Sequence, residues 1–149
     1  MKLYIINGPN LNLLGIREKN IYGEKSYQDL CDQIKKYAAT KYENLSVSIF
    51  QSNIEGELIN YLQQAFFDNV NGIIINPGAL SHYSYSLRDA IVSINLPTIE
   101  VHLSNIYARE KFRQKSVISE VCIGQICGLG YQSYNLAIDF FADYNTKKD

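Results

Sequence analysis

Residues 3–23 read LYIINGPNLNLLGIREKNIYG, and the interpretation of the whole chain depends on this stretch. Its first four residues are an apolar run that stops abruptly at Asn7-Gly8-Pro9, a pattern typical of a buried strand that ends at the edge of a sheet. The loop that follows is too long for a tight turn, and long connections in compact domains are usually lids or binding loops. We interpret residues 16–25 as a lid. The alternative is an ordinary surface loop with one solvated arginine, and composition alone leaves both readings open.

Length and composition indicate one globular domain. The chain has 149 residues, enough to bury a hydrophobic core, and 46% of them are hydrophobic and 19% charged. A formal net charge of -1 argues against a nucleic-acid or anionic-membrane surface, because both need clustered Lys and Arg. No apolar run approaches the ~20 residues of a membrane span, and the opening apolar stretch is too short for a secretory signal. We therefore expect a single domain over residues 1–149, located in the cytoplasm.

The three cysteines, Cys31, Cys122 and Cys127, do not match a metal-binding pattern. No CxxC is present, and two histidines leave little from which a zinc site could be built. Cys122 and Cys127 lie five positions apart in an apolar run, so in a strand their side chains would point to opposite faces. We expect all three cysteines to be small buried hydrophobic residues.

Strand and helix patterns alternate along the chain. Short apolar or alternating runs predict strands at residues 3–6, 46–50, 73–75, 98–101 and 121–126. Apolar residues at helical spacing predict helices over 27–41, from 58 to a stop at Gly72, over 87–94 and over 131–143. Ser26, three residues before Asp29, is a weak capping-box-like start for the first helix. A short helix is expected at 108–110, within the polar stretch 104–119, and a frayed, disordered tail at 145–149.

This alternation predicts an α/β fold, a three-layer sandwich with helices on both faces of a parallel sheet. Five strands of this length are typical of a flavodoxin-like sheet with the strand order 2-1-3-4-5. In such sheets ligands bind beyond the carboxyl ends of the strands, near the switch in strand order. Polar clusters follow the first, third and fourth strands, at residues 7–22, 76–84 and 100–105. We therefore expect one site where these clusters meet.

The polar clusters favour acid–base chemistry on a small polar substrate. GxGxxG, GxxxxGK[ST] and GxSxG are all absent, which argues against dinucleotides, nucleoside triphosphates and an elbow-type serine nucleophile. His102 directly follows the fourth strand, and Glu100 projects from the same side of it and could orient the imidazole. Arg17 could favour ionisation of Tyr22, because a nearby cation stabilises a phenolate. The alternatives are a structural histidine at a strand end and a tyrosine used only for packing.

Six motifs give the chain a specific resemblance to one enzyme family. They are NGPNLNLLG-x-RE-x-x-x-YG, QSN-x-EGELI, NPGALSH-x-S, LRDA, IEVHLSN-x-x-ARE-x-F and GQICGLG. They occur in order through nearly the whole chain, which resembles type II 3-dehydroquinate dehydratase. The resemblance implies a lyase of the shikimate pathway that converts 3-dehydroquinate to 3-dehydroshikimate by anti elimination of water through an enolate. It also implies a flavodoxin-like fold, no metal or organic cofactor, and a homododecamer built from trimers.

The resemblance also implies a role for each matched residue. Tyr22 matches the general base that takes the C2 proton, and Arg17 matches the arginine that keeps this tyrosine ionised. His102 matches the acid that protonates the departing C1 hydroxyl, with Glu100 as its partner. Asn10 matches an asparagine that holds a water against the enolate oxygen. The side chains that match those binding the substrate hydroxyls are Asn76, His82 and Arg113. The backbone amides of Leu103 and Ser104 match the site for the substrate carboxylate, and Asp89 matches a residue presented to a neighbouring subunit's site.

The sequence departs from the family's pattern at several positions, none of which matches a catalytic residue. Lys19 stands where proline is usual, Tyr107 where histidine is common, and Ser133 where glycine is common. Two other classes of function stay as alternatives. A non-catalytic flavodoxin-like module that binds a flavin or a small acidic ligand is disfavoured by the missing phosphate-binding loops. A protein–protein adaptor is disfavoured because the informative residues gather at strand ends and do not form an apolar patch.

Overall fold

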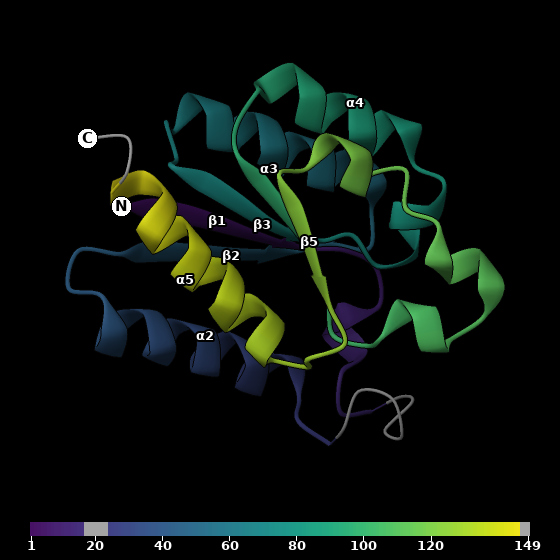
Figure 1. Ribbon diagram of the computed structural model, residues 1–149, viewed down its shortest axis with the longest axis horizontal. Helices are drawn as coiled ribbons and strands as arrows, with labels where there is room; N and C mark the ends of the chain where they lie inside the picture. The colour runs from purple at the N-terminus through teal and green to yellow at the C-terminus, as the bar shows by residue number, and fades with distance from the viewer. Residues whose placement is uncertain (17–23, 147–149) are drawn as a thin grey trace.

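The computed structural model describes residues 1–16 and 24–146, and its centre is a five-stranded parallel sheet (Figure 1). The strands are β1 (Lys2–Asn7), β2 (Ser46–Gln51), β3 (Gly72–Asn76), β4 (Thr98–His102) and β5 (Gly124–Cys127). Their order across the sheet is β2-β1-β3-β4-β5, and every neighbouring pair is parallel. The predicted sheet and strand order are therefore confirmed.

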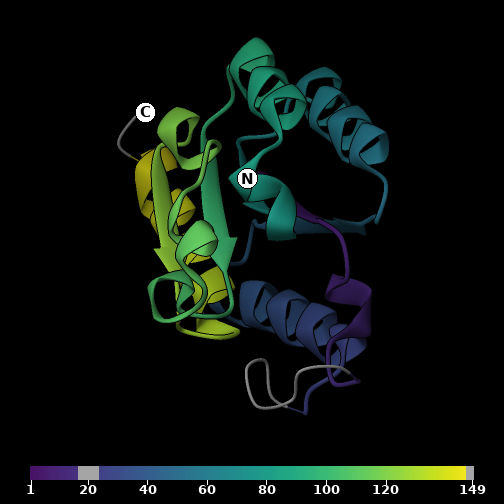
Figure 2. The same cartoon turned by 90° about the vertical axis from the view of Figure 1, so that its right-hand side faces the viewer.

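Helices cover both faces of this sheet, as Figures 1 and 2 show. On one face lie α3 (Glu55–Phe67) and α4 (Tyr85–Ile94), and on the other lie α2 (Tyr27–Lys41) and α5 (Gln132–Thr146). Alternate residues of β1 belong to the two cores, with Tyr4 and Ile6 packed toward α3 and α4, and Leu3 and Ile5 toward α2 and α5. Burial on both faces explains why the strand is an unbroken apolar run. No helix within the described ranges is long and apolar enough to cross a membrane.

The start of α2 confirms the predicted capping box. The Ser26 side chain accepts a hydrogen bond from the backbone N–H of Asp29 at 3.1 Å, and the Asp29 carboxylate accepts one from the Ser26 N–H at 2.8 Å. Two of the backbone donors at this helix end are thereby satisfied, which fixes where the helix begins.

The fifth strand begins later than predicted. Residues Ser119–Val121 form the short 3-10 helix η5, and β5 starts only at Gly124. The cause lies upstream, where the Ser116 hydroxyl accepts hydrogen bonds from the N–H groups of Ile118 and Ser119 and turns the chain. Cys122 therefore lies outside the strand, so the argument that placed it and Cys127 on opposite strand faces was wrong.

The predicted helix at 108–110 was also wrong. Two 3-10 helices flank this segment instead, η3 (Ile106–Ala108) and η4 (Lys111–Gln114). The Asn105 side chain accepts from the N–H of Tyr107 at 3.1 Å and starts η3 earlier than expected.

Three helix ends differ from prediction as well. α3 ends at Phe67, and the chain turns at Asn69, which has a φ of 51°, before Gly72 opens β3. α5 begins at Gln132 and ends at Thr146, three residues beyond its predicted end at 143, so residues 145 and 146 belong to the helix and not to the predicted tail. The stacking of Phe140 and Tyr144, with ring centroids 5.4 Å apart, extends this helix toward the carboxyl end. Residues 147–149 lie outside the described part of the chain.

The Asn-Gly-Pro stop of β1 and the Asn-Pro-Gly stop of β3 lie directly against each other. The Gly8 N–H donates to the Asn76 carbonyl at 2.7 Å. A Cβ added at Gly8 would lie 2.6 Å from the Pro77 carbonyl oxygen, so no larger residue fits. Gly78 has a φ of +58°, which favours glycine, and a Cβ added there would lie 3.1 Å from the Pro9 carbonyl oxygen. The two loops therefore form one joined floor at the carboxyl edge of the sheet.

Candidate active site

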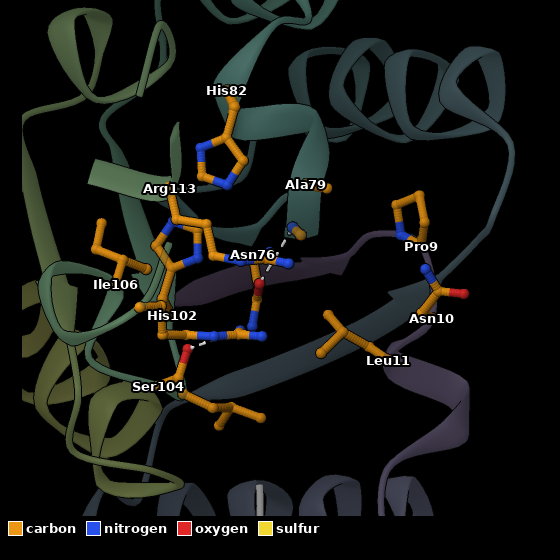
Figure 3. A pocket seen from close by; sticks show the side chains of 13 residues that line it. Pro9, Asn10, Leu11, Asn76, Ala79, His82, His102, Ser104, Ile106 and Arg113 are labelled. Carbon is orange, nitrogen blue, oxygen red and sulfur yellow. Dashed lines mark hydrogen bonds between the residues drawn. The ribbon is translucent and has the colours of Figure 1, made fainter. Parts of the chain in front are cut away.

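A pocket opens at the carboxyl ends of β1, β3 and β4, where the sequence predicted a site (Figure 3). It encloses about 150 Å³. Seven of the predicted site residues line it, namely Asn10, Asn76, His82, His102, Leu103, Ser104 and Arg113. The other lining residues within the described part of the chain are Pro9, Leu11, Gly78, Ala79, Ile106 and Arg109. The topology thus brings together three polar clusters that are far apart in the sequence.

The predicted contact between Glu100 and His102 is confirmed. Glu100 is fully buried, and its Oε1 lies 2.5 Å from Nε2 of His102. The Ser116 hydroxyl donates to both carboxylate oxygens at 3.0 and 2.8 Å, and Gln125 donates to one of them at 3.2 Å. Because an ionised carboxylate only accepts, Nε2 of His102 carries the hydrogen. The Nδ1 atom is then the ring nitrogen left for exchange with a ligand.

His82 lies across the pocket as a neutral hydrogen-bond acceptor. Its Nδ1 is 2.8 Å from the Lys115 carbonyl oxygen, and a carbonyl accepts only, so Nδ1 carries the hydrogen. Burial lowers the pKa of His82 below its ordinary value of 6.5, with the Lys115 carbonyl acting in the opposite direction. The ring is therefore neutral near pH 7, and Nε2 offers a lone pair.

Among the described residues, two arginines line the pocket, and the sequence reasoning named only one of these two as a site residue. Arg113 donates from Nε to the Glu110 carboxylate at 2.7 Å, and its guanidinium lies 4.7 Å from the centre of the Phe112 ring. Arg109 donates from Nη1 to the Ser104 hydroxyl at 3.4 Å. The sequence could have indicated Arg109 as a site residue, because it lies four positions before Arg113 in the same polar stretch. Guanidinium groups at a pocket suit a ligand that carries a carboxylate.

Asn10 lies at the exposed edge of the pocket in an unusual backbone conformation. Its φ of 69° is in the left-handed region, which asparagine tolerates better than most residues. The Asn10 N–H donates to the Asn53 side-chain oxygen at 2.9 Å, and Gln51 donates to that oxygen at 3.2 Å and to the Gly8 carbonyl at 3.3 Å. The QSN motif therefore holds the first part of the long loop in place.

The long loop is anchored in the core where it leaves the pocket. It contains the 3-10 helix η1 (Leu11–Leu13), and both Leu11 and Leu14 are buried against the core that α2 and α5 cover. The predicted lid residues Arg17 and Tyr22 lie outside the described residues, as does Lys19.

Asp89 lies apart from the pocket. It is exposed on α4 and is not among the described lining residues.

Within 1–16 and 24–146, no three His, Cys, Asp or Glu side chains are grouped to hold a metal ion. Cys31 is buried, while Cys122 and Cys127 are only partly so.

The sequence from residue 1 to 142 matches the family model described as dehydroquinase class II. The chain belongs to this family. A 3-dehydroquinate dehydratase of Clostridium beijerinckii is 57% identical over 138 residues, which cover 93% of each protein. One from Fusobacterium nucleatum is 52% identical over 99% of this chain and 100% of its own. The crystal structure of a type II dehydroquinase from Butyrivibrio crossotus has a TM-score of 0.92 and 50% identity, and the match covers 95% of this chain and 97% of that one.

These comparisons confirm the predicted family and the flavodoxin-like fold of class II dehydroquinases. Asn76 and Gly78 line the pocket from the end of β3, and His102 lines it from the end of β4, with Glu100 buried behind the imidazole.

Proposed function

We propose that this pocket removes water from 3-dehydroquinate to give 3-dehydroshikimate, a lyase step of the shikimate pathway. Membership of the class II dehydroquinase family supports this reaction, as do relatives at 52–57% identity named 3-dehydroquinate dehydratase. The observation that carries the proposal is the buried Glu100–His102 pair, which opens onto a pocket lined by two arginines. An acid held in this way can protonate a leaving hydroxyl of an anionic substrate.

The proposed elimination has two steps. Tyr22, ionised by Arg17, takes the C2 proton, and the electron pair moves onto the ketone oxygen to form an enolate. A water held by Asn10 donates a hydrogen bond to this oxygen as charge develops. The enolate then re-forms the ketone, the C1–C2 double bond forms, and the C1 hydroxyl leaves as water with a proton from His102.

The remaining pocket residues hold the substrate. The neutral His82 accepts a hydrogen bond at Nε2 from a substrate hydroxyl, and Asn76 and Arg113 contact the other polar groups. The backbone N–H groups of Leu103 and Ser104, just beyond β4, bind the substrate carboxylate. Closure of the lid over residues 16–25 excludes solvent from the enolate.

The direct test of this function is the absorbance of the product. 3-Dehydroshikimate is a conjugated enone with a strong ultraviolet absorption, whereas 3-dehydroquinate lacks the conjugated double bond. We expect absorbance to rise when substrate is added to purified protein, and the preparation to be colourless. A yellow preparation with no enone formation would favour the flavin-binding alternative instead.

The enolate route predicts activity that needs neither a Schiff base nor an added metal. None of the described residues that line the pocket is a lysine, and the two lysines within the motifs of the three central strand ends, Lys19 and Lys111, both stand at variable positions of those motifs. Treatment with borohydride in the presence of substrate should leave turnover intact, and chelators should have no effect on the initial rate. Mass spectrometry that found substrate attached to a lysine would contradict this mechanism.

We also propose a dodecamer built from trimers, in which Asp89 reaches the site of a neighbouring subunit. Its exposure on α4 leaves the carboxylate accessible to another chain. Asp89→Ala should raise KM and weaken assembly in light scattering. Asp32→Ala, a matched change at an exposed aspartate on α2, should alter neither. A monodisperse monomer with full wild-type activity would contradict the proposal.

A cytoplasmic location is part of the same proposal. All three cysteines are unpaired, which is ordinary in a reducing compartment, where disulfides rarely persist.

A further inference from the structure

A chain of hydrogen bonds lies directly beneath the pocket and ends on one of its lining residues. At its centre is Tyr134, in the first turn of α5, whose side chain is completely buried. The Tyr134 hydroxyl donates to Oδ1 of Asn7 at 2.6 Å and accepts from Nδ2 of Asn76 at 3.0 Å. It therefore joins the carboxyl ends of β1 and β3 from below.

Each end of this chain continues to one more group. Beyond Asn76, the backbone N–H of Gly78 donates to Oδ1 of Asn76 at 3.3 Å, a contact drawn in Figure 3. Beyond Asn7, its Nδ2 donates to the Tyr27 hydroxyl at 3.3 Å. This chain of hydrogen bonds thus runs from the loop after β3 to the first residue of α2.

The direction of every bond in the chain is fixed from the Gly78 end. A backbone N–H can only donate, so the side-chain oxygen of Asn76 must face Gly78, and its NH₂ group must face Tyr134. The Tyr134 oxygen then accepts, and its hydrogen goes to Oδ1 of Asn7. Burial raises the pKa of Tyr134 far above its ordinary value, so the hydroxyl keeps that hydrogen at all working pH values. The amide of Asn7 is oriented in turn, with Nδ2 toward Tyr27.

This arrangement determines what Asn76 offers to a ligand. A primary amide has two N–H donors and two oxygen lone pairs, and one of each is used by Tyr134 and Gly78. One donor and one acceptor remain, at fixed places on a side chain that is only 3% exposed and lines the pocket. If the amide were flipped, its free donor and its free acceptor would exchange places. A ligand hydroxyl positioned to accept from the amide nitrogen would then face the amide oxygen instead.

We propose that Tyr134 is a positioning residue, whose buried hydroxyl fixes the amide of Asn76 in the orientation that binds a hydroxyl of the substrate. The proposal rests on the proposed dehydratase function and assigns to α5 a part in substrate recognition. Tyr134 touches no substrate, so it acts only through Asn76.

The test is Tyr134→Phe, which removes the hydroxyl and keeps the ring. Without its acceptor, Nδ2 of Asn76 loses its partner, and the amide is held only by Gly78. We expect KM to rise about three- to tenfold, the range that corresponds to one neutral hydrogen bond, while kcat changes less than twofold. The reaction is followed by enone absorbance over a range of 3-dehydroquinate concentrations.

Tyr4→Phe is the matched control. Tyr4 is also a buried tyrosine, and its hydroxyl bonds to Asp68, on the face of the sheet that α3 and α4 cover. Both variants should lower the melting temperature, because each loses one hydroxyl hydrogen bond. KM should rise in Tyr134→Phe only. Equal KM values for wild type and a folded Tyr134→Phe would overturn the proposal and leave Tyr134 with a purely structural role.

A double-mutant cycle separates action through Asn76 from an independent effect. In an Asn76→Ala background, Tyr134→Phe should change KM less than twofold, because the amide that it orients is gone. The same three- to tenfold rise in that background would overturn the proposal. If Tyr134→Phe does not fold, Tyr27→Phe applies the same test at the other end of the hydrogen-bond network, where Tyr27 is half-buried. It should raise KM about twofold by freeing the Asn7 amide, and an unchanged KM would overturn the proposal.

The same data distinguish failure of this inference from failure of the proposed function. No enone formation by the wild-type protein would reject the dehydratase reaction itself. An active wild-type protein with an unchanged Tyr134→Phe KM would reject the positioning role alone.

Discussion

The His102→Ala variant is expected to lose about 10²- to 10⁴-fold in kcat, the range that general acid catalysis contributes. His102 is held by a fully buried carboxylate at 2.5 Å, with its second ring nitrogen left for the substrate. Removal of the imidazole leaves the C1 hydroxyl to depart without a positioned proton. The loss should appear in kcat at saturating substrate, measured by the initial rate of enone formation.

Two comparisons make this prediction specific to an acid. Glu100→Gln should lose less than His102→Ala, because the carboxylate orients the ring and does not itself transfer the proton. His82→Ala should act mainly on KM, because toward the substrate its neutral ring offers only the accepting Nε2. His102→Gln fills more of the space and keeps a donor for Glu100, so it tests the same loss if the alanine variant is unstable. Equal kcat for the wild type and a folded His102 variant would show that the histidine is structural.

The sheet could be predicted because local patterns and topology agree for its strands. The unbroken apolar runs at β1 and β3 are buried on both faces, and the Asn, Gly and Pro residues that stop them meet in the folded chain. The spacing of Glu100 and His102 on one strand made their contact predictable, since residues two apart project from the same face. The strand runs and the Glu100–His102 contact each follow from a short stretch of sequence, and the parallel topology brings the strand ends together.

The segment between β4 and β5 could not be predicted in the same way. It consists of 3-10 helices that carry no regular apolar period, and side-chain hydrogen bonds from Asn105 and Ser116 decide where they begin. Ser116 and Gln125 therefore did not emerge as partners of Glu100, although both donate to it. Such contacts depend on where a loop returns to the sheet.

The network beneath the pocket depends on still longer sequence separations. Tyr134 lies 127 positions from Asn7 and 58 from Asn76, and one tyrosine among 12 carries no signal of its own. In the sequence it was only an apolar position on the final helix. Its place in the site follows from the helix packing under the ends of β1 and β3.

Tyr22→Phe is expected to fold, assemble and bind substrate while turnover nearly vanishes. The replacement removes one hydroxyl and keeps the aromatic ring, so packing should barely change. If Tyr22 is the base, its loss leaves the C2 proton without an acceptor, and the reaction stops before the enolate forms. Substrate binding, measured by calorimetry with the inactive variant, should stay within a few-fold of the wild-type value, and kcat should fall below detection.

Arg17→Ala provides the complementary change, because it keeps the phenol and removes the cation that ionises it. An unassisted tyrosine has a pKa near ~10, so near neutral pH the phenol would keep its proton and turnover would fall sharply. Ionisation then returns as pH rises toward that value. Activity should therefore recover in part at high pH in Arg17→Ala, and not at all in Tyr22→Phe, which has no group left to ionise.

The contrast between these two pH profiles decides the role of the loop. A base that is merely unionised can be restored by hydroxide, whereas a missing base cannot. Lys19, close by in the sequence, is a competing source of positive charge, so Lys19→Ala serves as the control and should shift the profile less than Arg17→Ala. Substantial turnover by Tyr22→Phe near neutral pH would place the base elsewhere, and Arg17 would then act on the substrate instead of on a phenol.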